Sequence, residues 1–163
     1  MIQIRRHALV RYSPAQMFDL VNDVEAYPTR FPWCADAEIL AREGDATLVA
    51  RLDLRFAGLT QSFTTRNTAE RPHRLHMQLV EGPLRTLEGE FTFVALGPSK
   101  AGSRDGKAES RAMSPSPSGC KISLALDFDY AGLLTGPALR LGFHGLANRL
   151  VDDFCRVATK VYG

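Results

Sequence analysis

The C-terminal stretch of the chain has the longest apolar periodicity in the sequence and constrains the fold more than any other feature. From residue 139 onward, large apolar side chains recur at steps of three and four, at Leu139, Phe143, Leu146, Leu150, Phe154, Val157 and Val161. This spacing is typical of one face of an α-helix. Pro137 suits a first turn, because the N–H that proline lacks would have no intrahelical partner there. The spacing predicts a helix over residues 137–161, around which the other elements wrap.

The rest of the chain alternates apolar and polar residues with a period of two, which indicates strands with one buried face. Strands are expected over residues 2–10, 35–40, 47–56, 59–67, 75–79, 87–93 and 121–130. Ser13 before Pro14 predicts the start of a helix over 14–23, and a second short helix is expected over 25–31. Short turns between strands make the sheet antiparallel. We predict a single α+β domain in which a curved sheet of about seven strands wraps the C-terminal helix.

Residues 97–119 differ in kind from the rest of the chain. They contain six Ser, four Gly and three Pro, and Met113 is their only large apolar residue. A segment of this composition buries too little apolar surface to order itself. We therefore predict a flexible insertion at a hairpin tip.

Length and composition are typical of one soluble domain. The 163 residues are enough for a core or an enclosed cavity, and a net charge of +2 does not by itself indicate nucleic acid, so no DNA partner is expected. Cys34, Cys120 and Cys155 form no C-x-x-C and are interpreted as free thiols in a reducing compartment. No segment has the ~20 apolar residues of a membrane span or the form of a signal peptide. We expect a cytoplasmic protein, with peripheral contact at the inner face of the cytoplasmic membrane as an open alternative.

Several short motifs resemble a known family. The chain reads L-V-N-D-V at 20–24, Y-P at 27–28, F-P-W-C at 31–34, F-T-T-R-N at 63–67, G-P-L-R-T-L at 82–87 and D-F-D-Y at 127–130. These motifs, with the order of elements, resemble the START-like superfamily (polyketide cyclase/dehydrase-like) and its helix-grip fold. Within it they are similar to the branch of coenzyme-Q-binding proteins and bacterial ribosome association toxin A proteins. The branch commonly has Trp-x-Phe where this chain has F-T-F at 91–93, a difference that bears on cavity shape.

The inward-facing apolar residues are the candidate ligand site. Those from the strands and the long helix are Phe56, Phe63, Leu79, Phe91, Phe93, Phe128, Leu146, Leu150 and Phe154. They are interpreted either as a solid core or as the walls of a tunnel for a long apolar ligand, which is what the resemblance favours. Gln61, Thr65 and Asn67 share a strand face and are candidates for contact with a polar head group.

The segment around Tyr27, Phe31 and Trp33 is a second candidate, because three aromatic residues lie close together beside two prolines. Such rings either pack under a loop or form the mouth of a cavity, where a ring with a polar tip suits a wet apolar entrance. The resemblance favours the mouth or lid.

Charged residues give weaker signals. Strand alternation turns five arginines outward, and a sixth lies in a turn: Arg5, Arg11, Arg51, Arg55, Arg66 and Arg85. They are interpreted either as contacts to phosphate groups or as an ordinary protein surface, and the low net charge favours the second interpretation. Asp152 with Arg156 and Arg149 with Asp153 are spaced as surface ion pairs of a helix. His73 and His76 point to opposite faces of a strand, so no shared metal is expected.

The resemblance implies non-catalytic binding of a polyprenyl quinone (ubiquinone) or a similar lipid, by a carrier or chaperone that supports respiratory electron transport, with no further cofactor. Two alternatives remain open: a regulator that binds the large ribosomal subunit and blocks subunit joining, and an enzyme of the polyketide cyclase type. An enzyme needs an acid or base in the cavity. Arg6 is the only charged residue that strand parity turns inward, so we expect no enzyme.

Overall fold

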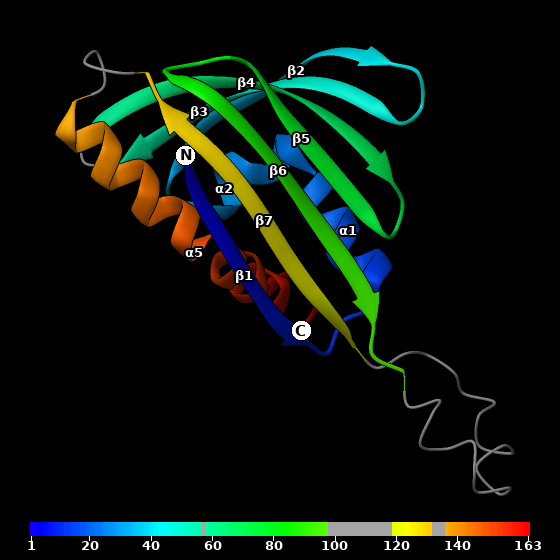
Figure 1. Ribbon diagram of the computed structural model, residues 1–163. Helices are drawn as coiled ribbons and strands as arrows, with labels where there is room; N and C mark the ends of the chain where they lie inside the picture. Colours follow the sequence, from blue (N-terminus) through cyan, green and yellow to red (C-terminus); the bar gives the residue numbers. More distant parts are fainter. Residues whose placement is uncertain (57, 98–118, 132–135) are drawn as a thin grey trace, which may run out of the picture.

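The computed structural model describes residues 1–56, 58–97, 119–131 and 136–163 (Figure 1). Its elements follow the predicted order: β1 (Ile2–Val10), α1 (Pro14–Asn22), the 3-10 helix η1 (Val24–Ala26), α2 (Tyr27–Arg30), β2 (Cys34–Glu43), β3 (Thr47–Phe56), β4 (Leu59–Glu70), β5 (Arg74–Glu81), β6 (Leu84–Ala95), β7 (Cys120–Tyr130) and α5 (Pro137–Tyr162). The predicted α+β helix-grip class is confirmed. The predicted insertion lies almost wholly in residues 98–118, outside the described residues.

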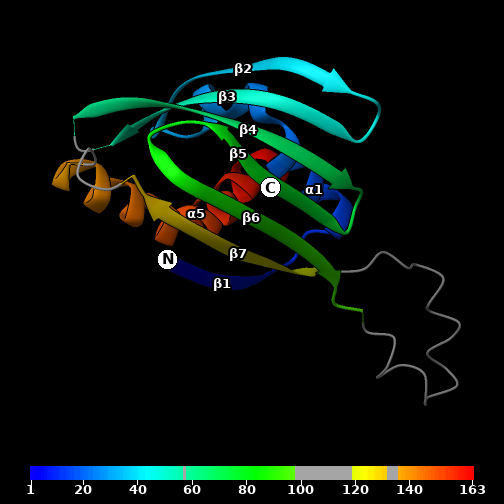
Figure 2. The same cartoon turned by 45° about the horizontal axis from the view of Figure 1, so that its top comes forward.

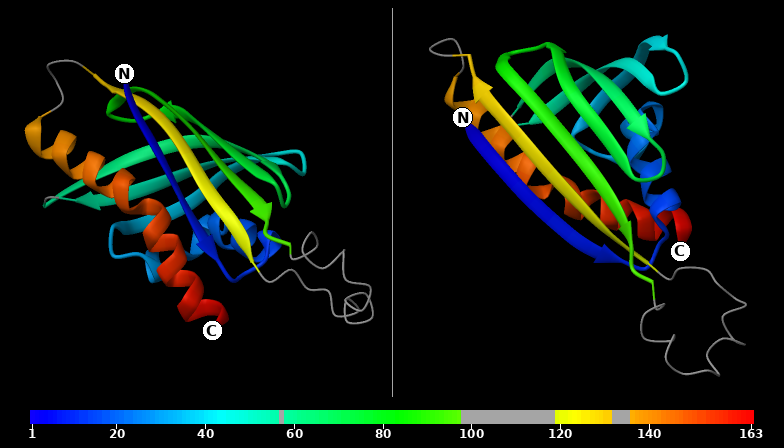
Figure 3. Two further views of the ribbon diagram at one scale, coloured as in Figure 1. Left: turned by 60° about the horizontal axis from the view of Figure 1, so that its bottom comes forward. Right: turned by 45° about the vertical axis from the view of Figure 1, so that its right-hand side comes forward.

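The seven strands form one antiparallel sheet in the order β1-β7-β6-β5-β4-β3-β2. Each strand from β2 to β6 lies beside its successor in the chain, and β1 pairs with β7 at the other edge of the sheet. The sheet is curved, and α5 runs along its concave side with α1 and α2 beside the C-terminal half of α5 (Figures 1, 2 and 3). Between sheet and helix lies the space in which a ligand site can form.

Local sequence explains why α1 begins where it does. The Ser13 side chain accepts a hydrogen bond from the Gln16 backbone N–H, and the Gln16 side chain accepts one from the Ser13 N–H. This reciprocal capping box satisfies two otherwise unpaired donors at the start of the helix. At the other end of the chain, the Tyr162 hydroxyl donates to the Gln16 carbonyl oxygen at 2.8 Å, which fixes the end of α5 against α1.

The predicted strand parity is confirmed, because inward positions such as Ile122, Leu124 and Phe128 of β7 are fully buried. The predicted apolar face of α5 is confirmed up to Val157, but the prediction is wrong at Val161, whose side chain is 43% exposed. In this last turn Tyr162, rather than Val161, packs inward, with its ring centroid 5.6 Å from that of Tyr12.

Candidate ligand-binding cavity

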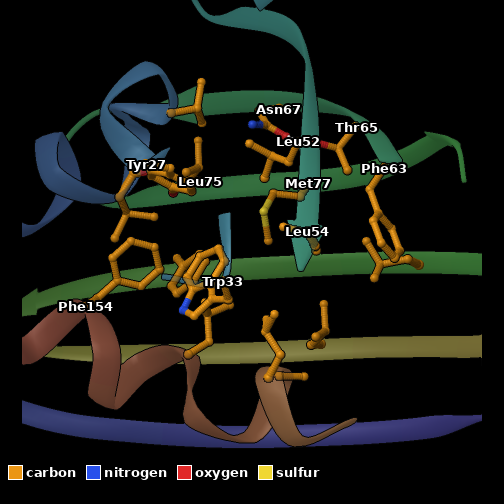
Figure 4. Close-up of a pocket in the computed structure, with 18 of the residues that line it drawn as sticks. Tyr27, Trp33, Leu52, Leu54, Phe63, Thr65, Asn67, Leu75, Met77 and Phe154 are labelled. Carbon is orange, nitrogen blue, oxygen red and sulfur yellow. Dashed lines mark hydrogen bonds between the residues drawn. The ribbon is translucent and has the colours of Figure 1, made fainter. Parts of the chain in front are cut away.

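A cavity of about 100 Å³ lies between the concave side of the sheet and α5 (Figure 4). Its walls come from β3 to β7, from the end of α1 and the segment between α1 and β2, and from one face of α5. The lining residues are Val21, Val24, Tyr27, Trp33, Leu52, Leu54, Phe63, Thr65, Asn67, Leu75, Met77, Leu87, Phe91, Leu126, Phe143, Leu146, Ala147, Leu150 and Phe154. All of them are neutral, and most are hydrocarbon.

Seven of the twelve residues predicted for the ligand site line this cavity: Tyr27, Trp33, Phe63, Phe91, Leu146, Leu150 and Phe154. The other five lie outside the lining: Phe31, which precedes β2, and Phe56, Leu79, Phe93 and Phe128, which are on the inward faces of their strands. Two examples give the reason. Phe93 packs edge-on against Phe18 at 5.7 Å between centroids, and Phe128 packs against Phe143 at 4.9 Å. These rings fill the core around the cavity.

Sequence reasoning missed lining residues on β3, β5, β6 and β7. Leu52, Leu75 and Met77 are inward by the same alternation, so the signal for their burial was present. Alternation along a strand tells which face of the sheet a side chain occupies, but not where that side chain lies relative to the helix that covers the face. The position at which α5 crosses the sheet decides which inward residues border the empty space.

Two buried polar side chains interrupt the apolar lining. Thr65 and Asn67 are 8% and 4% exposed, and the Thr65 hydroxyl donates to Asn67 Oδ1 at 2.9 Å. Both line the cavity, as predicted for a head-group contact, whereas Gln61 on the same strand face is half-buried and lies outside the lining.

The three rings of the aromatic segment before β2 are buried, and two of them, Tyr27 and Trp33, form part of the cavity wall. Phe31 and Trp33 stack at 4.6 Å between ring centroids, and Phe31 contacts Phe154 of α5 edge-on at 5.0 Å. The Tyr27 hydroxyl is buried and donates to the carbonyl oxygen of Val21. Burial raises the pKa of Tyr27 far above its ordinary value, so the phenol stays protonated at neutral pH.

Asp153 corrects a second expectation. It was predicted in a surface pair with Arg149, but it is 5% exposed and accepts a hydrogen bond from Trp33 Nε1 at 2.9 Å. Its other oxygen pairs with Arg156, three residues further along α5, so the predicted pair of Asp152 with Arg156 is not the one formed. Asp153 lies three residues after Leu150 and four before Val157, so helical spacing put it on the apolar face, which was the available signal for its burial.

Arg6, predicted to turn inward, does not enter the cavity. Its side chain is exposed and donates to the Asn148 side-chain oxygen of α5. β1 is an edge strand, so the inward-facing side chain of Arg6 lies beside α5 and not in the core. The described lining therefore contains no charged residue.

Most of the outward arginines are neutralised by nearby carboxylates. Arg51 contacts Asp36, Glu38 and Asp53 at 2.8, 2.7 and 3.2 Å, and Arg66 contacts Glu43 at 3.1 Å. The other two such pairs are Arg5 with Asp127 and Arg85 with Asp129. Arg11 and Arg55 instead donate to the backbone carbonyls of Gly163 and Pro32. The outer face of the sheet thus has the paired charges of an ordinary surface.

The three cysteines are free thiols, as predicted. Burial raises the pKa of Cys34 and of Cys120 to about 11, and it also raises the pKa of Cys155. These thiols therefore stay protonated at neutral pH and lack the thiolate character of a nucleophile. Within the described part of the chain, no helix has the length and apolar content needed to cross a bilayer.

The chain is similar to known proteins over nearly its whole length. Residues 10–155 match the family described as polyketide cyclase / dehydrase and lipid transport. The ribosome association toxin RatA of Pseudomonas aeruginosa is 39% identical over 160 residues, which cover 98% of this chain and 97% of that protein. RatA of Escherichia coli K12 is 35% identical over 162 residues, covering 99% and 90%.

More distant similarities agree with this fold. The mitochondrial coenzyme Q-binding protein COQ10 homolog B of Xenopus laevis is 22% identical over 163 residues, covering 99% of this chain and 60% of that protein. Among solved structures, a START superfamily protein from Mycobacterium smegmatis superposes with a TM-score of 0.73 at 20% identity over 98% of both chains. That similarity concerns the fold alone.

Proposed function

This chain belongs to the polyketide cyclase / dehydrase and lipid transport family, in the START-like branch of ribosome association toxins and coenzyme-Q-binding proteins, and we propose that it binds a polyprenyl quinone such as ubiquinone, or a similar lipid, beneath α5. In this proposal the protein is a carrier or chaperone that supports respiratory electron transport. So apolar a ligand would be exchanged by peripheral contact of a cytoplasmic protein with the membrane surface.

The observation that carries the proposal is the character of the cavity lining, which is apolar and free of charge in the described residues. Its volume is about 100 Å³. An apolar cavity of roughly 150 Å³ takes up benzene, so this cavity is smaller than a quinone ring and has to widen when one binds. The tail of a polyprenyl ligand would extend beyond the space that the cavity provides.

The same lining favours a carrier over a cyclase-like enzyme. General acid–base catalysis needs a titratable group whose pKa lies near the working pH. The one phenol in the described lining, Tyr27, has a strongly raised pKa and donates its hydroxyl hydrogen to Val21. The nearby carboxylate of Asp153 is already engaged by Trp33 and Arg156. We accordingly propose that no bond of the ligand is made or broken.

A charge in the cavity wall tests this proposal. Leu150 lines the cavity, whereas Leu141 of the same helix is 76% exposed. We expect Leu150→Lys to lower the quinone content of the purified protein at least about tenfold, because an unpaired ammonium group would face an apolar site. The matched variant Leu141→Lys should keep its quinone. Mass spectrometry of organic extracts measures both, and circular dichroism verifies folding. Equal quinone content in folded forms of both variants would contradict the proposal.

A second candidate function is association with the large ribosomal subunit, which the names of relatives at 34–39% identity suggest. Binding to ribosomal RNA requires cations that are available to phosphates. In the described residues, seven cations have no ion pair in the structure: Arg6, Arg11, Arg42, Arg55, Lys121, Arg149 and Lys160. Four of them, Arg6, Arg11, Arg149 and Lys160, lie on α5, on β1 or just after β1.

Co-sedimentation with large subunits tests this second candidate. We expect the double variant Arg6→Glu with Arg149→Glu to lose binding, and wild-type binding to weaken steeply between about 50 and 200 mM salt. Arg66→Glu is the matched control, because the charge of Arg66 is already paired with Glu43. Binding that is insensitive to salt and to the double variant would exclude this surface.

A further inference from the structure

The hydrogen-bonded pair of Thr65 and Asn67 bears on which ligands the cavity selects. This inference rests on the proposed function. Both residues are on the inward face of β4 and line the cavity. The Thr65 hydroxyl donates to Asn67 Oδ1 at 2.9 Å, so the amide oxygen faces Thr65. Figure 4 shows the Asn67 nitrogen on the side of the amide remote from Thr65. The hydrogen bond thereby fixes the direction in which the Asn67 NH₂ group points.

The Asn67 NH₂ group is a buried donor without a protein partner. Asn67 is 4% exposed, and no acceptor among the described residues is bonded to its Nδ2. Among the described residues, Tyr12 Oη is the only fully enclosed side-chain nitrogen or oxygen atom without a hydrogen-bond partner. Asn67 Nδ2 also lacks a partner, so it is not fully enclosed and has open space beside it. The space that Asn67 borders is the cavity.

The other polar lining side chains have already used their donor hydrogens. The Tyr27 hydroxyl donates to the Val21 carbonyl oxygen, and Trp33 Nε1 donates to Asp153. The Thr65 hydroxyl donates to Asn67. Among the described lining residues, the Asn67 amide is thus the side-chain donor left for a ligand. Buried donors are almost always paired in proteins, so this one favours a ligand that brings an acceptor.

We propose that Asn67, oriented by Thr65, recognises the ligand through a carbonyl oxygen and selects neutral carbonyl-bearing lipids. A quinone ring meets this requirement, because its carbonyl accepts from Nδ2 while its apolar edge faces the lining. A hydrocarbon leaves the Asn67 donor unpaired. A fatty acid carboxylate is disfavoured for a different reason, since the described lining contains no cation to compensate a buried negative charge.

Titration of the full chain with small probes tests this assignment. Trp33 is the single tryptophan and lines the cavity, so quenching of its fluorescence by a bound quinone reports occupancy. The probes are 2,3-dimethoxy-5-methyl-1,4-benzoquinone, 1,2,4-trimethylbenzene as a ring without carbonyls, and decanoate; the last two are measured by competition. We expect the quinone to bind roughly threefold to tenfold more tightly than the hydrocarbon, the range of one net hydrogen bond, and decanoate to bind most weakly.

Variants of β4 supply the matched comparison. Asn67→Leu keeps the approximate side-chain shape and should remove the preference for the quinone, with a hydrocarbon affinity that is equal or higher because no donor is left unpaired. Gln61→Leu, on the same strand face but outside the lining, should retain the preference. If Asn67→Leu does not fold, Thr65→Val decides the matter, because loss of the orienting hydroxyl should lower the preference about twofold or more.

The outcomes separate the two proposals. Equal wild-type affinity for quinone and hydrocarbon, or a preference that survives Asn67→Leu, would overturn the role of Asn67 and leave an unselective apolar site. Absence of binding by every probe would instead remove the proposed lipid-binding function itself.

Discussion

At the scale of single residues, the hydrogen bond from Trp33 to Asp153 joins two parts of the chain that are 120 residues apart. The carboxylate is 5% exposed, and its compensation comes from the Trp33 indole and from Arg156. A buried charge that loses a partner is strongly destabilised, because the remaining groups no longer offset its desolvation. This bond therefore fixes the aromatic segment against α5 and keeps the adjacent cavity wall in place.

We predict that Trp33→Phe lowers the free energy of unfolding by about 1.5–3 kcal/mol, the usual contribution of a hydrogen bond to a charged group. Phenylalanine preserves an aromatic ring beside Phe31 but removes the N–H donor. Urea unfolding followed by circular dichroism measures the change. In a double-mutant cycle, Asp153→Asn should cost less in the Trp33→Phe background than in the wild type. Additive effects would mean that the hydrogen bond does not stabilise the fold.

At the scale of elements, the distance between α5 and β3 is set by a glycine. A Cβ atom at Gly142 would lie 2.5 Å from Phe56 Cδ2, closer than atoms can approach, and 3.2 Å from Phe56 Cβ, a tight contact. The absence of a side chain at Gly142 allows the first half of α5 to close over β3. At Gly145, one turn further, a Cβ would meet only Arg149 Nη1 at 3.5 Å.

These two glycines give a matched pair of substitutions. We predict that Gly142→Ala destabilises the protein by about 1–3 kcal/mol, because the added methyl group overpacks the contact with Phe56. Gly145→Ala should instead stabilise it by up to about 1 kcal/mol through the higher helix propensity of alanine. Thermal and urea unfolding of both variants measure the difference. Equal stability of the two variants would show that Gly142 does not set the position of α5.

Most elements could be predicted from the sequence, because each depends on a local alternation or helical spacing of apolar residues. The cavity depends on longer-range geometry. Phe93 and Phe63 share the inward parity, yet Phe93 packs on Phe18 and only Phe63 borders the empty space. Likewise, the helical pattern placed Asp153 at the edge of the apolar stripe, but only the fold brings Trp33 to it.

At the scale of the whole molecule, charge and apolar surface are separated. The outer face of the sheet carries arginines paired with carboxylates, such as Arg5 with Asp127 and Arg66 with Glu43. The concave side encloses a neutral cavity under α5. Exposed pairs of this kind contribute little to stability, and their compensated charges are poor ligands for phosphate. The arrangement favours a protein that recognises its ligand inside the fold.

The central claim is that the ligand binds between the sheet and α5, and an NMR titration of the ¹⁵N-labelled full chain tests it most directly. The titrant is a benzoquinone with a short isoprenoid tail. Two side-chain N–H signals lie at the cavity, the indole of Trp33 and the amide of Asn67, while the Arg51 side chain on the outer face of the sheet is the control. We predict saturable shifts of the Trp33 and Asn67 signals with one common affinity and an unchanged Arg51 signal. Shifts confined to the outer face, with Trp33 and Asn67 unaffected at saturation, would contradict the claim.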